Sequence, residues 1–313
     1  MSESAKGILA MIAACVVWGL SGIYYKALSH VPPEQVLSHR ALWSFLFFAG
    51  VLLVQGRISA LGEALGSRRN ALLLICATAM ISLNWLVFIS SVQTGHATEA
   101  SLGYYINPLF NFLFGALLFG ERFSKLQFVA IALAALGVLN QTLNVGSFPW
   151  IAMSLCLTFA VYSVIRKYVE VDGRVGFVIE VLLLAPFAIA YLIYLWSKGA
   201  PLLAEGISVS IWLALSGIIT AAPLIFFSIA ARRLRLSTIG ILQYIGPSLQ
   251  FSLALYFGEP FKTAHAITFG LIWIGMGLFS YSLWRQDVNS RAQTSVTENV
   301  QKKSPASMED VRG

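Results

Sequence analysis

Ten apolar segments, each long enough to cross a lipid bilayer, take up most of this chain. A helix needs about 20 mostly apolar residues to cross about 30 Å of hydrocarbon, because each residue rises 1.5 Å. The segments of this kind cover residues 7–25, 34–55, 71–93, 97–119, 124–143, 148–166, 175–197, 208–231, 236–257 and 263–284. In lipid a single segment pairs its own backbone polar groups only as a helix. The chain is therefore predicted to be an all-α integral membrane protein with ten transmembrane helices.

Composition supports this class and argues against others. Only 11% of the residues are charged and the mean hydropathy is +0.76, whereas a soluble domain has about 25% charged residues. The net charge of +7 does not indicate nucleic-acid binding, because the positive residues lie between apolar segments and form no single basic face. The connections are too short to fold as soluble domains. The lipid bilayer is thus the expected environment, and no nucleic-acid partner is expected.

The positive residues are distributed unequally between the two sides of the predicted membrane. Seventeen Lys and Arg residues fall on one side, three on the other, and Arg40 lies inside a span. The three are Lys26, Lys198 and Lys262. Because cytoplasmic loops carry the excess of Lys and Arg, both termini are expected to be cytoplasmic. Residues 1–6 are then a short cytoplasmic N-terminus, and residues 285–313, polar and without aromatic side chains, are expected to be a disordered cytoplasmic tail.

One sequence pattern occurs twice, once in each half of the chain. Tyr105-Ile106-Asn107-Pro108 returns as Tyr244-Ile245-Gly246-Pro247, and Phe119-Gly120-Glu121 returns at nearly the same offset as Phe257-Gly258-Glu259. Each copy places a proline in an apolar segment, where it removes a backbone donor and disturbs the helix. In a membrane such a break is tolerated beside protein or a wet cavity. The two breaks are therefore expected near a solute site at the midplane.

The duplication predicts two repeats of five spans, residues 7–143 and 148–284. Because five is odd, the second repeat crosses the membrane in the opposite sense from the first. Inverted repeats are typical of secondary transporters, which bind solute between the repeats and expose it alternately to the two sides. Duplication for packing alone is the other interpretation, and channels also contain inverted duplications.

Ionisable side chains inside the predicted spans are candidates for function, since a central charge costs at least about 2.5 kcal/mol on insertion scales. Arg40 and Glu180 are separated by nearly the offset of the repeat, and Glu99 lies near the outer end of the fourth span. If both Arg40 and Glu180 face the cavity, its opposite charges suit a zwitterionic or polar solute. Pairing within the protein is the alternative for each, and Glu99 is a candidate partner of Arg40. His39 is a candidate for proton coupling, or else a hydrogen-bonding group.

Uncharged polar and aromatic residues near the proline breaks or in the middle of spans complete the predicted site. Such groups provide directed hydrogen bonds in a mostly apolar pocket. These candidates are Trp18, Asn84, Tyr105, Asn107, Gln243 and Tyr244. The expected partners are a small-molecule solute and, if transport is coupled, protons; a homodimer is left open.

Several chemistries find no support in the sequence. There is no nucleotide-binding G-x-x-x-x-G-K-[ST] loop, no H-E-x-x-H and no Cys-x-x-Cys. No catalytic residue, metal site or cofactor is therefore expected, and the chain is not expected to be an enzyme. An ion channel is the main alternative, although no ring of repeated polar residues is seen. A lipid-processing enzyme is less favoured, because Glu99 and Glu180 are predicted near opposite faces.

The motifs, taken together and in order, resemble those of the EamA-type drug/metabolite transporter superfamily, and more closely its RarD branch. The resemblance covers residues 7 to about 284. Its residues are Leu37-Ser38-His39-Arg40, Trp43-Ser44, Asn84-Trp85, Phe88-Ile89, Glu99-Ala100-Ser101-Leu102-Gly103-Tyr104, Ile106-Asn107-Pro108, Arg232-Arg233-Leu234-Arg235-Leu236-Ser237-Thr238 and Gln243-Tyr244-Ile245-Gly246-Pro247. The resemblance implies a multi-pass permease of the bacterial inner membrane with both termini inside. RarD proteins are linked by name to chloramphenicol sensitivity, which does not identify the solute.

Overall fold

The computed structural model describes residues 3–119, 124–145, 148–199, 206–234, 238–239 and 242–303, and within these the secondary structure is helical throughout, without strands. Eight of the helices are long and apolar enough to cross a membrane. The helices are α1 (Glu3–Ala27), α2 (Pro33–Val54), α3 (Ser59–Gly66), α4 (Arg68–Gln93), α5 (Ala97–Phe119), α6 (Lys125–Val145), α7 (Trp150–Tyr168), α8 (Gly173–Ser197), α9 (Ile207–Ala231), α11 (Ile245–Tyr256) and α12 (Thr263–Lys303). The protein is thus an all-α membrane protein.

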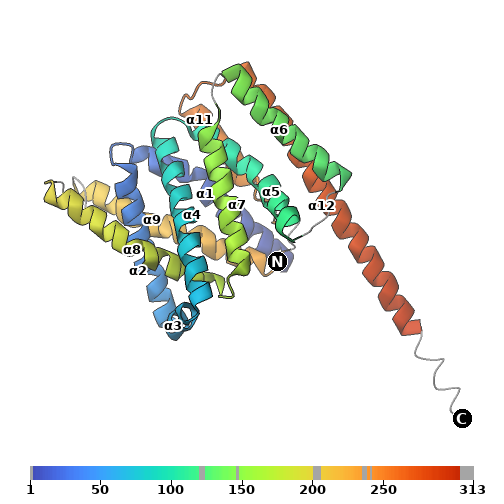
Figure 1. Cartoon of the computed structure of the whole chain (residues 1–313), viewed down its shortest axis with the longest axis horizontal. Helices are drawn as coiled ribbons and strands as arrows, with labels where there is room; N and C mark the ends of the chain where they lie inside the picture. The colour runs from blue at the N-terminus through green and yellow to red at the C-terminus, as the bar shows by residue number, and fades with distance from the viewer. Residues whose placement is uncertain are drawn as a thin grey trace, which may run out of the picture.

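Most predicted spans coincide with one helix, and α3 is an additional short helix between α2 and α4. Figure 1 shows α6 lying beside α12 at one edge of the bundle, with α8 at the opposite edge. Between these edges α1 packs on α9, α4 on α7, α2 on α8 and α5 on α11. Helices from the two halves of the sequence therefore alternate in the interior of the bundle.

The ninth predicted span, residues 236–257, differs from one continuous helix. A turn at Gln243 and Tyr244 precedes α11, and Pro247 is the third residue of that helix. A proline is tolerated in the first turn, because the amide hydrogen there has no intrahelical acceptor. By contrast α5 continues through Pro108. Residues 235–237 and 240–241 lie outside the described residues, as do Gly120 and Glu121 of the repeated motif.

Close approach between helix backbones depends on glycine at two contacts. A Cβ atom added at Gly103 of α5 would lie 2.6 Å from the carbonyl oxygen of Ala152 in α7. One added at Gly275 of α12 would lie 2.9 Å from the carbonyl oxygen of Ala130 in α6. Small residues let membrane helices approach closely enough for backbone packing. The sequence at these positions therefore sets the helix spacing on both sides of the bundle.

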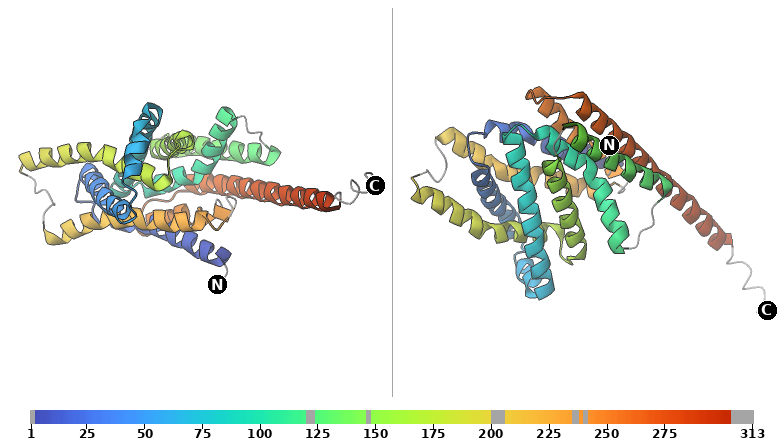
Figure 2. Two further views of the ribbon diagram at one scale, coloured as in Figure 1. Left: turned by 90° about the horizontal axis from the view of Figure 1, so that it is seen from below. Right: turned by 45° about the horizontal axis from the view of Figure 1, so that its top comes forward.

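The expectation of a disordered tail from residue 285 does not agree with the structure at residues 285–303, which continue α12 to Lys303. Figure 2 shows this helix extending past the rest of the protein in both views. The stretch from Arg285 to Lys303 contains neither glycine nor proline, so nothing in it interrupts a helix that is already nucleated. The first proline is Pro305, which follows the end of the described helix; residues 304–313 lie outside the described residues.

Candidate solute-binding cavity

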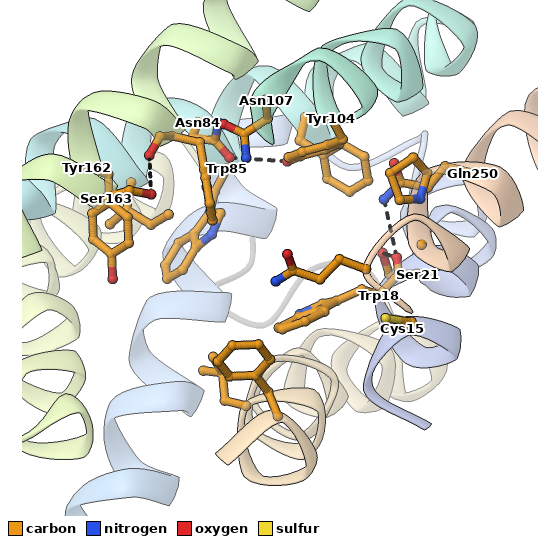
Figure 3. A pocket seen from close by; sticks show the side chains of 18 of the residues that line it. Cys15, Trp18, Ser21, Asn84, Trp85, Tyr104, Asn107, Tyr162, Ser163 and Gln250 are labelled. Carbon is orange, nitrogen blue, oxygen red and sulfur yellow. Dashed lines mark hydrogen bonds between the residues drawn. The ribbon is translucent and has the colours of Figure 1, made fainter. Parts of the chain in front are cut away.

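A cavity of about 800 Å³ lies in the interior of the bundle and is lined by α1, α2, α4, α5, α7, α8, α9, α11 and α12. Most of its lining is apolar or aromatic, and Figure 3 shows the rings of Trp18 and Trp85 entering it from different helices. Volumes of this order accommodate a drug-sized molecule. Phe279 and Leu283 of the last helix, α12, also contribute to the lining of the cavity.

Arg40 of α2 is the main charged group of this cavity. Its side chain is buried, with 8% of the residue exposed. Nε donates a hydrogen bond to Thr220 Oγ1 at 2.9 Å, and Nη1 donates to the Tyr25 hydroxyl oxygen at 2.9 Å. The guanidinium carbon lies 4.1 Å from the ring centre of Trp85. These contacts hold the cation with neutral groups and a π face, and no carboxylate lies within 4.0 Å of it among the described residues.

The side-chain amide of Asn84 forms hydrogen bonds with three other residues of the protein. Nδ2 donates to the carbonyl oxygen of Leu155 at 2.8 Å and to Thr158 Oγ1 at 3.0 Å, while Oδ1 accepts from the Tyr104 hydroxyl at 3.1 Å. Figure 3 shows Asn84 beside Tyr104 in the wall of the cavity. These bonds connect α4, α5 and α7. Asn84 therefore lines the cavity but uses its hydrogen-bonding capacity to join helices.

Four further candidates line the same cavity: Trp18, Asn107, Gln243 and Tyr244. Trp18 of α1 packs against Phe227 of α9, with ring centres 6.1 Å apart. Asn107 Oδ1 is buried and has no hydrogen-bond partner among the described residues. The two proline-containing segments bring Asn107 and Tyr244 to a common space, although the two residues belong to different halves of the sequence.

Tyr105 does not line this cavity. Its ring stacks on that of Tyr244 at a centre-to-centre distance of 6.5 Å, and its hydroxyl lies 2.7 Å from Ser248 Oγ. It faces a second pocket of about 590 Å³ that also contains Phe251 and Trp273. Tyr244 lines both pockets, whereas Tyr105 lines only the second.

Glu99 is neither in the cavity nor paired with Arg40. Its Oε1 accepts hydrogen bonds from the backbone amides of Ile151 at 2.9 Å and Ala152 at 3.4 Å, in the first turn of α7. A carboxylate at a helix N-terminus is stabilised by the free amides and by the helix dipole. The expectation that Glu99 serves as the partner of Arg40 is therefore wrong. Its contacts join α5 to α7.

Glu180 of α8 is 1% exposed and does not line the cavity. Its Oε1 lies 3.4 Å from Nη1 of Arg166, and its Oε2 accepts from the Tyr162 hydroxyl at 3.1 Å. Because Arg166 neutralises it, Glu180 does not supply the anionic half of a cavity that binds both ends of a zwitterion. Tyr162, which does line the cavity, separates the carboxylate from that space.

His39 is buried on α2 next to Arg40 but is not among the residues that line the cavity. Successive residues of a helix point about 100° apart, so the two side chains face different neighbours. A solute in this cavity is therefore not expected to contact His39 directly.

The lining residues that were not among the sequence candidates include Tyr25, Tyr162, Lys167 and Thr220. Thr220 is far from Arg40 in the sequence, and nothing in its local sequence indicates the contact. Lys167 looked like an ordinary cytoplasmic charge at the end of a span. The presence of Arg40 within a span was a signal that polar partners must exist, but it did not identify them.

Comparison with known proteins agrees with this architecture. Residues 5–140 match the EamA-like transporter family. A solved crystal structure with 20% sequence identity covers 90% of this chain and 99% of its own, with a TM-score of 0.60, so the fold has been observed before.

Three bacterial relatives extend the match along the chain. An uncharacterised transporter of Vibrio cholerae is 42% identical over 89% of this chain and 93% of its own. Protein RarD of Escherichia coli K12 is 38% identical over 88% and 94%, respectively. The chloramphenicol-sensitive protein RarD of Pseudomonas aeruginosa is 32% identical over 88% and 94%.

These relatives and the eight candidate spans indicate a multi-pass transporter of the bacterial inner membrane that acts on a small molecule. The similarity to transporters also argues against an enzyme. The chain therefore belongs to the EamA-like transporter family, and within it to the RarD proteins of the drug/metabolite transporter superfamily.

Proposed function

We propose that this protein is a secondary carrier that moves a small polar or amphipathic molecule by alternating access. The observation that carries the proposal is the cavity of about 800 Å³, with the buried Arg40 in its wall, between helices from both halves of the chain. A buried charge beside a cavity at membrane depth is expensive, and a solute pathway accounts for its presence.

An inverted repeat of five plus five spans is supported by the way the helices pair. If α1, α2, α4, α5 and α6 correspond in order to α7, α8, α9, α11 and α12, then the packing of α1 on α9 corresponds to that of α4 on α7. The contact of α1 with α11 likewise corresponds to that of α7 with α5. The contact of α2 with α9 corresponds to that of α8 with α4, and the pairs α2–α8, α5–α11 and α6–α12 join equivalent helices. A pseudo-two-fold axis in the membrane plane produces this pattern.

One end of the cavity is closed by a cluster of buried side chains, here called the Tyr25 cluster. Its members are Tyr24, Tyr25, Leu28, Val31, Val36, Phe88, Ile89, Val92, Ala97, Ala100, Leu155, Leu213 and Ala254. With both termini cytoplasmic, as the charge distribution indicates, these residues lie in the outer halves of their helices or, for Leu28 and Val31, in the outer connection between α1 and α2. At the other end, Lys167 and Leu283 line the cavity near the cytoplasmic ends of α7 and of the apolar part of α12. We assign the structure to an inward-facing state.

Glu259 strengthens the closed outer end. Its Oε1 accepts from the backbone amide of Ala97 at 2.6 Å and its Oε2 from that of Thr98 at 2.7 Å. These bonds connect the segment between α11 and α12 to the N-terminus of α5, where a negative charge is favoured. Opening the outer side requires this contact and the Tyr25 cluster to separate.

The test is substrate counterflow into liposomes that contain the purified protein, with a panel of amino acids, small metabolites and amphenicols. The expected result is saturable counterflow of at least one compound, and a pH gradient tests proton coupling in the same vesicles. Conductance that does not saturate would identify a channel instead. Absence of counterflow for every compound would remove the support for a carrier.

A further inference from the structure

We propose that the cavity binds an organic anion, a carboxylate on an aromatic or otherwise apolar body, and that Arg40 is its anion receptor. This inference rests on the proposed transport function and names the class of solute. It replaces the zwitterion expected from pairing Arg40 with Glu180, because Glu180 is held by Arg166 outside the cavity.

Arg40 retains hydrogen-bond donors for a ligand. Of the five N–H groups of a guanidinium, one on Nε is donated to Thr220 and one on Nη1 is donated to Tyr25. Among the described residues no acceptor is seen for the other three N–H groups of Arg40. Nη2 does not belong to the fully buried side-chain atoms that have no hydrogen-bond partner. The planar fork of a guanidinium matches the two oxygens of a carboxylate. The guanidinium is therefore oriented by the protein and still able to hold an anion.

Among the described residues, no carboxylate forms an ion pair with Arg40. Glu99 is bound to amides of α7 and Glu180 to Arg166 and Tyr162. A buried charge without a counter-ion is costly, and a neutral hydroxyl compensates only part of the cost. An anionic solute supplies the missing charge and gains strength from the low dielectric of the site.

The lining of the cavity also disfavours a positive group on the solute. Its charged members among the described residues are Arg40 and Lys167, and no Asp or Glu is present among them. An ammonium group would therefore meet like charges and no carboxylate.

Aromatic side chains define the rest of the solute. Trp85 covers one face of Arg40, and Trp18, Phe159 and Phe227 add apolar surface. Figure 3 shows the rings of Trp18 and Trp85 projecting into the cavity from different helices. A flat apolar body fits this environment, because aromatic rings pack face to face with an offset or edge to face. A small inorganic anion would leave most of this surface without a partner.

Four matched probes test the inference on the purified full-length protein. They share a phenylpropyl skeleton and differ in charge: 3-phenylpropionate is an anion, 3-phenylpropanamide is neutral, 3-phenylpropylamine is a cation and phenylalanine is a zwitterion. Binding is measured as a shift of the Tm and as quenching of tryptophan fluorescence. We expect saturable effects with 3-phenylpropionate and little or none with the other three.

The variants Arg40→Gln and Arg40→Lys separate charge from geometry. Arg40→Gln is expected to weaken 3-phenylpropionate binding by about ten- to hundredfold, the range for charge-assisted hydrogen bonds, and Arg40→Lys by less. Arg232→Gln removes an exposed arginine outside the cavity and is the control, expected to bind as the wild type does. If Arg40→Gln does not yield a monodisperse protein, Arg40→Lys and Thr220→Val, which releases Nε, still test the geometry.

Equal binding of the amide or of phenylalanine, unchanged binding by both Arg40 variants, or no binding of 3-phenylpropionate to the wild type would overturn the inference. Counterflow of labelled probes distinguishes it from the proposed function. If the anion binds in an Arg40-dependent way but shows no counterflow, the proposed anion site is supported and the proposed carrier function is not. If the amide or the amine shows saturable counterflow and the carboxylate does not, the proposed carrier function is supported and the proposed anion site is not.

Discussion

The guanidinium of Arg40 stacks on the indole of Trp85, with 4.1 Å between the guanidinium carbon and the ring centre. The two residues come from α2 and α4, so the contact joins two helices of the first half across the cavity wall. A cation over an indole gains about 2 kcal/mol when both are desolvated. The stacking orients the guanidinium plane and leaves its edge for a ligand.

Replacing Trp85 by Leu is expected to raise the KM for the transported solute by about tenfold, because Arg40 loses its π partner and its fixed plane. Trp85→Phe keeps an aromatic face and is expected to have a smaller effect. Uptake kinetics in proteoliposomes measure the difference. Identical KM values for the two variants would show that the aromatic face of Trp85 does not contribute to solute affinity.

Replacing Glu259 by Gln is expected to weaken the outer closure, because the side chain loses its charge and keeps an acceptor oxygen for only one of the two backbone amides at the start of α5. A loss of about 1 kcal/mol shifts the population between inward- and outward-facing states by about fivefold. Cavity access from the cytoplasmic side is read with Ser163→Cys, which lines the cavity, in a background without the native cysteines.

With Glu259→Gln added, the rate at which an impermeant maleimide labels this thiol from the cytoplasmic side should fall. An unchanged labelling rate would mean that Glu259 only stabilises the end of α5. Glu63→Gln, which alters an exposed carboxylate of α3, is the matched control.

Gly103→Ala is expected to destabilise the protein by about 1–3 kcal/mol, because its Cβ would lie 2.6 Å from a backbone carbonyl oxygen of α7 that cannot move independently. Gly50→Ala in α2 is the control, since nothing lies within 4 Å of a Cβ there. The Tm in detergent measures both. Gly50→Ala should leave the Tm unchanged or raise it, as a helix-interior alanine does. Equal Tm values for the two variants would contradict the close contact between α5 and α7.

Glu180→Gln is expected to lower stability by about 1–3 kcal/mol, because it removes the counter-ion of Arg166 in a buried setting. The double variant with Arg166→Gln should recover part of the loss, which a double-mutant cycle of Tm values would show. Solute affinity in the variants that remain folded should be close to that of the wild type. A large loss of affinity at wild-type stability would place Glu180 in the solute site after all.

Asn107→Gly and Gly246→Asn test whether one proline-containing segment serves mainly solute binding and the other mainly conformational change. Asn107 lines the cavity with an amide, whereas Gly246 at the start of α11 contributes only backbone. Asn107→Gly is expected to raise the KM severalfold with little change in turnover. Gly246→Asn is expected to lower turnover, because it hinders rearrangement at the turn before α11. Equal effects on both parameters in both variants would contradict this assignment.

The sequence alone determined the membrane class, the approximate limits of most helices and several candidate site residues. These properties depend on the transfer of local segments from water to lipid, which a sequence reports directly. Arg40, Asn107 and Tyr244 were found in this way, because a polar group or a proline within an apolar segment is conspicuous wherever the segment packs.

The tertiary structure alone decided which polar groups are partners. The charges of Arg40, Glu99 and Glu180 suggested a zwitterion site, yet Glu99 binds the start of α7 and Glu180 binds Arg166. Arg40 instead meets Thr220, which lies in the other half of the sequence. Such contacts depend on the rotation of each helix about its axis and on the neighbours it meets. A difference of one residue in sequence turns a side chain by about 100°, which is enough to move it from the cavity to a helix interface.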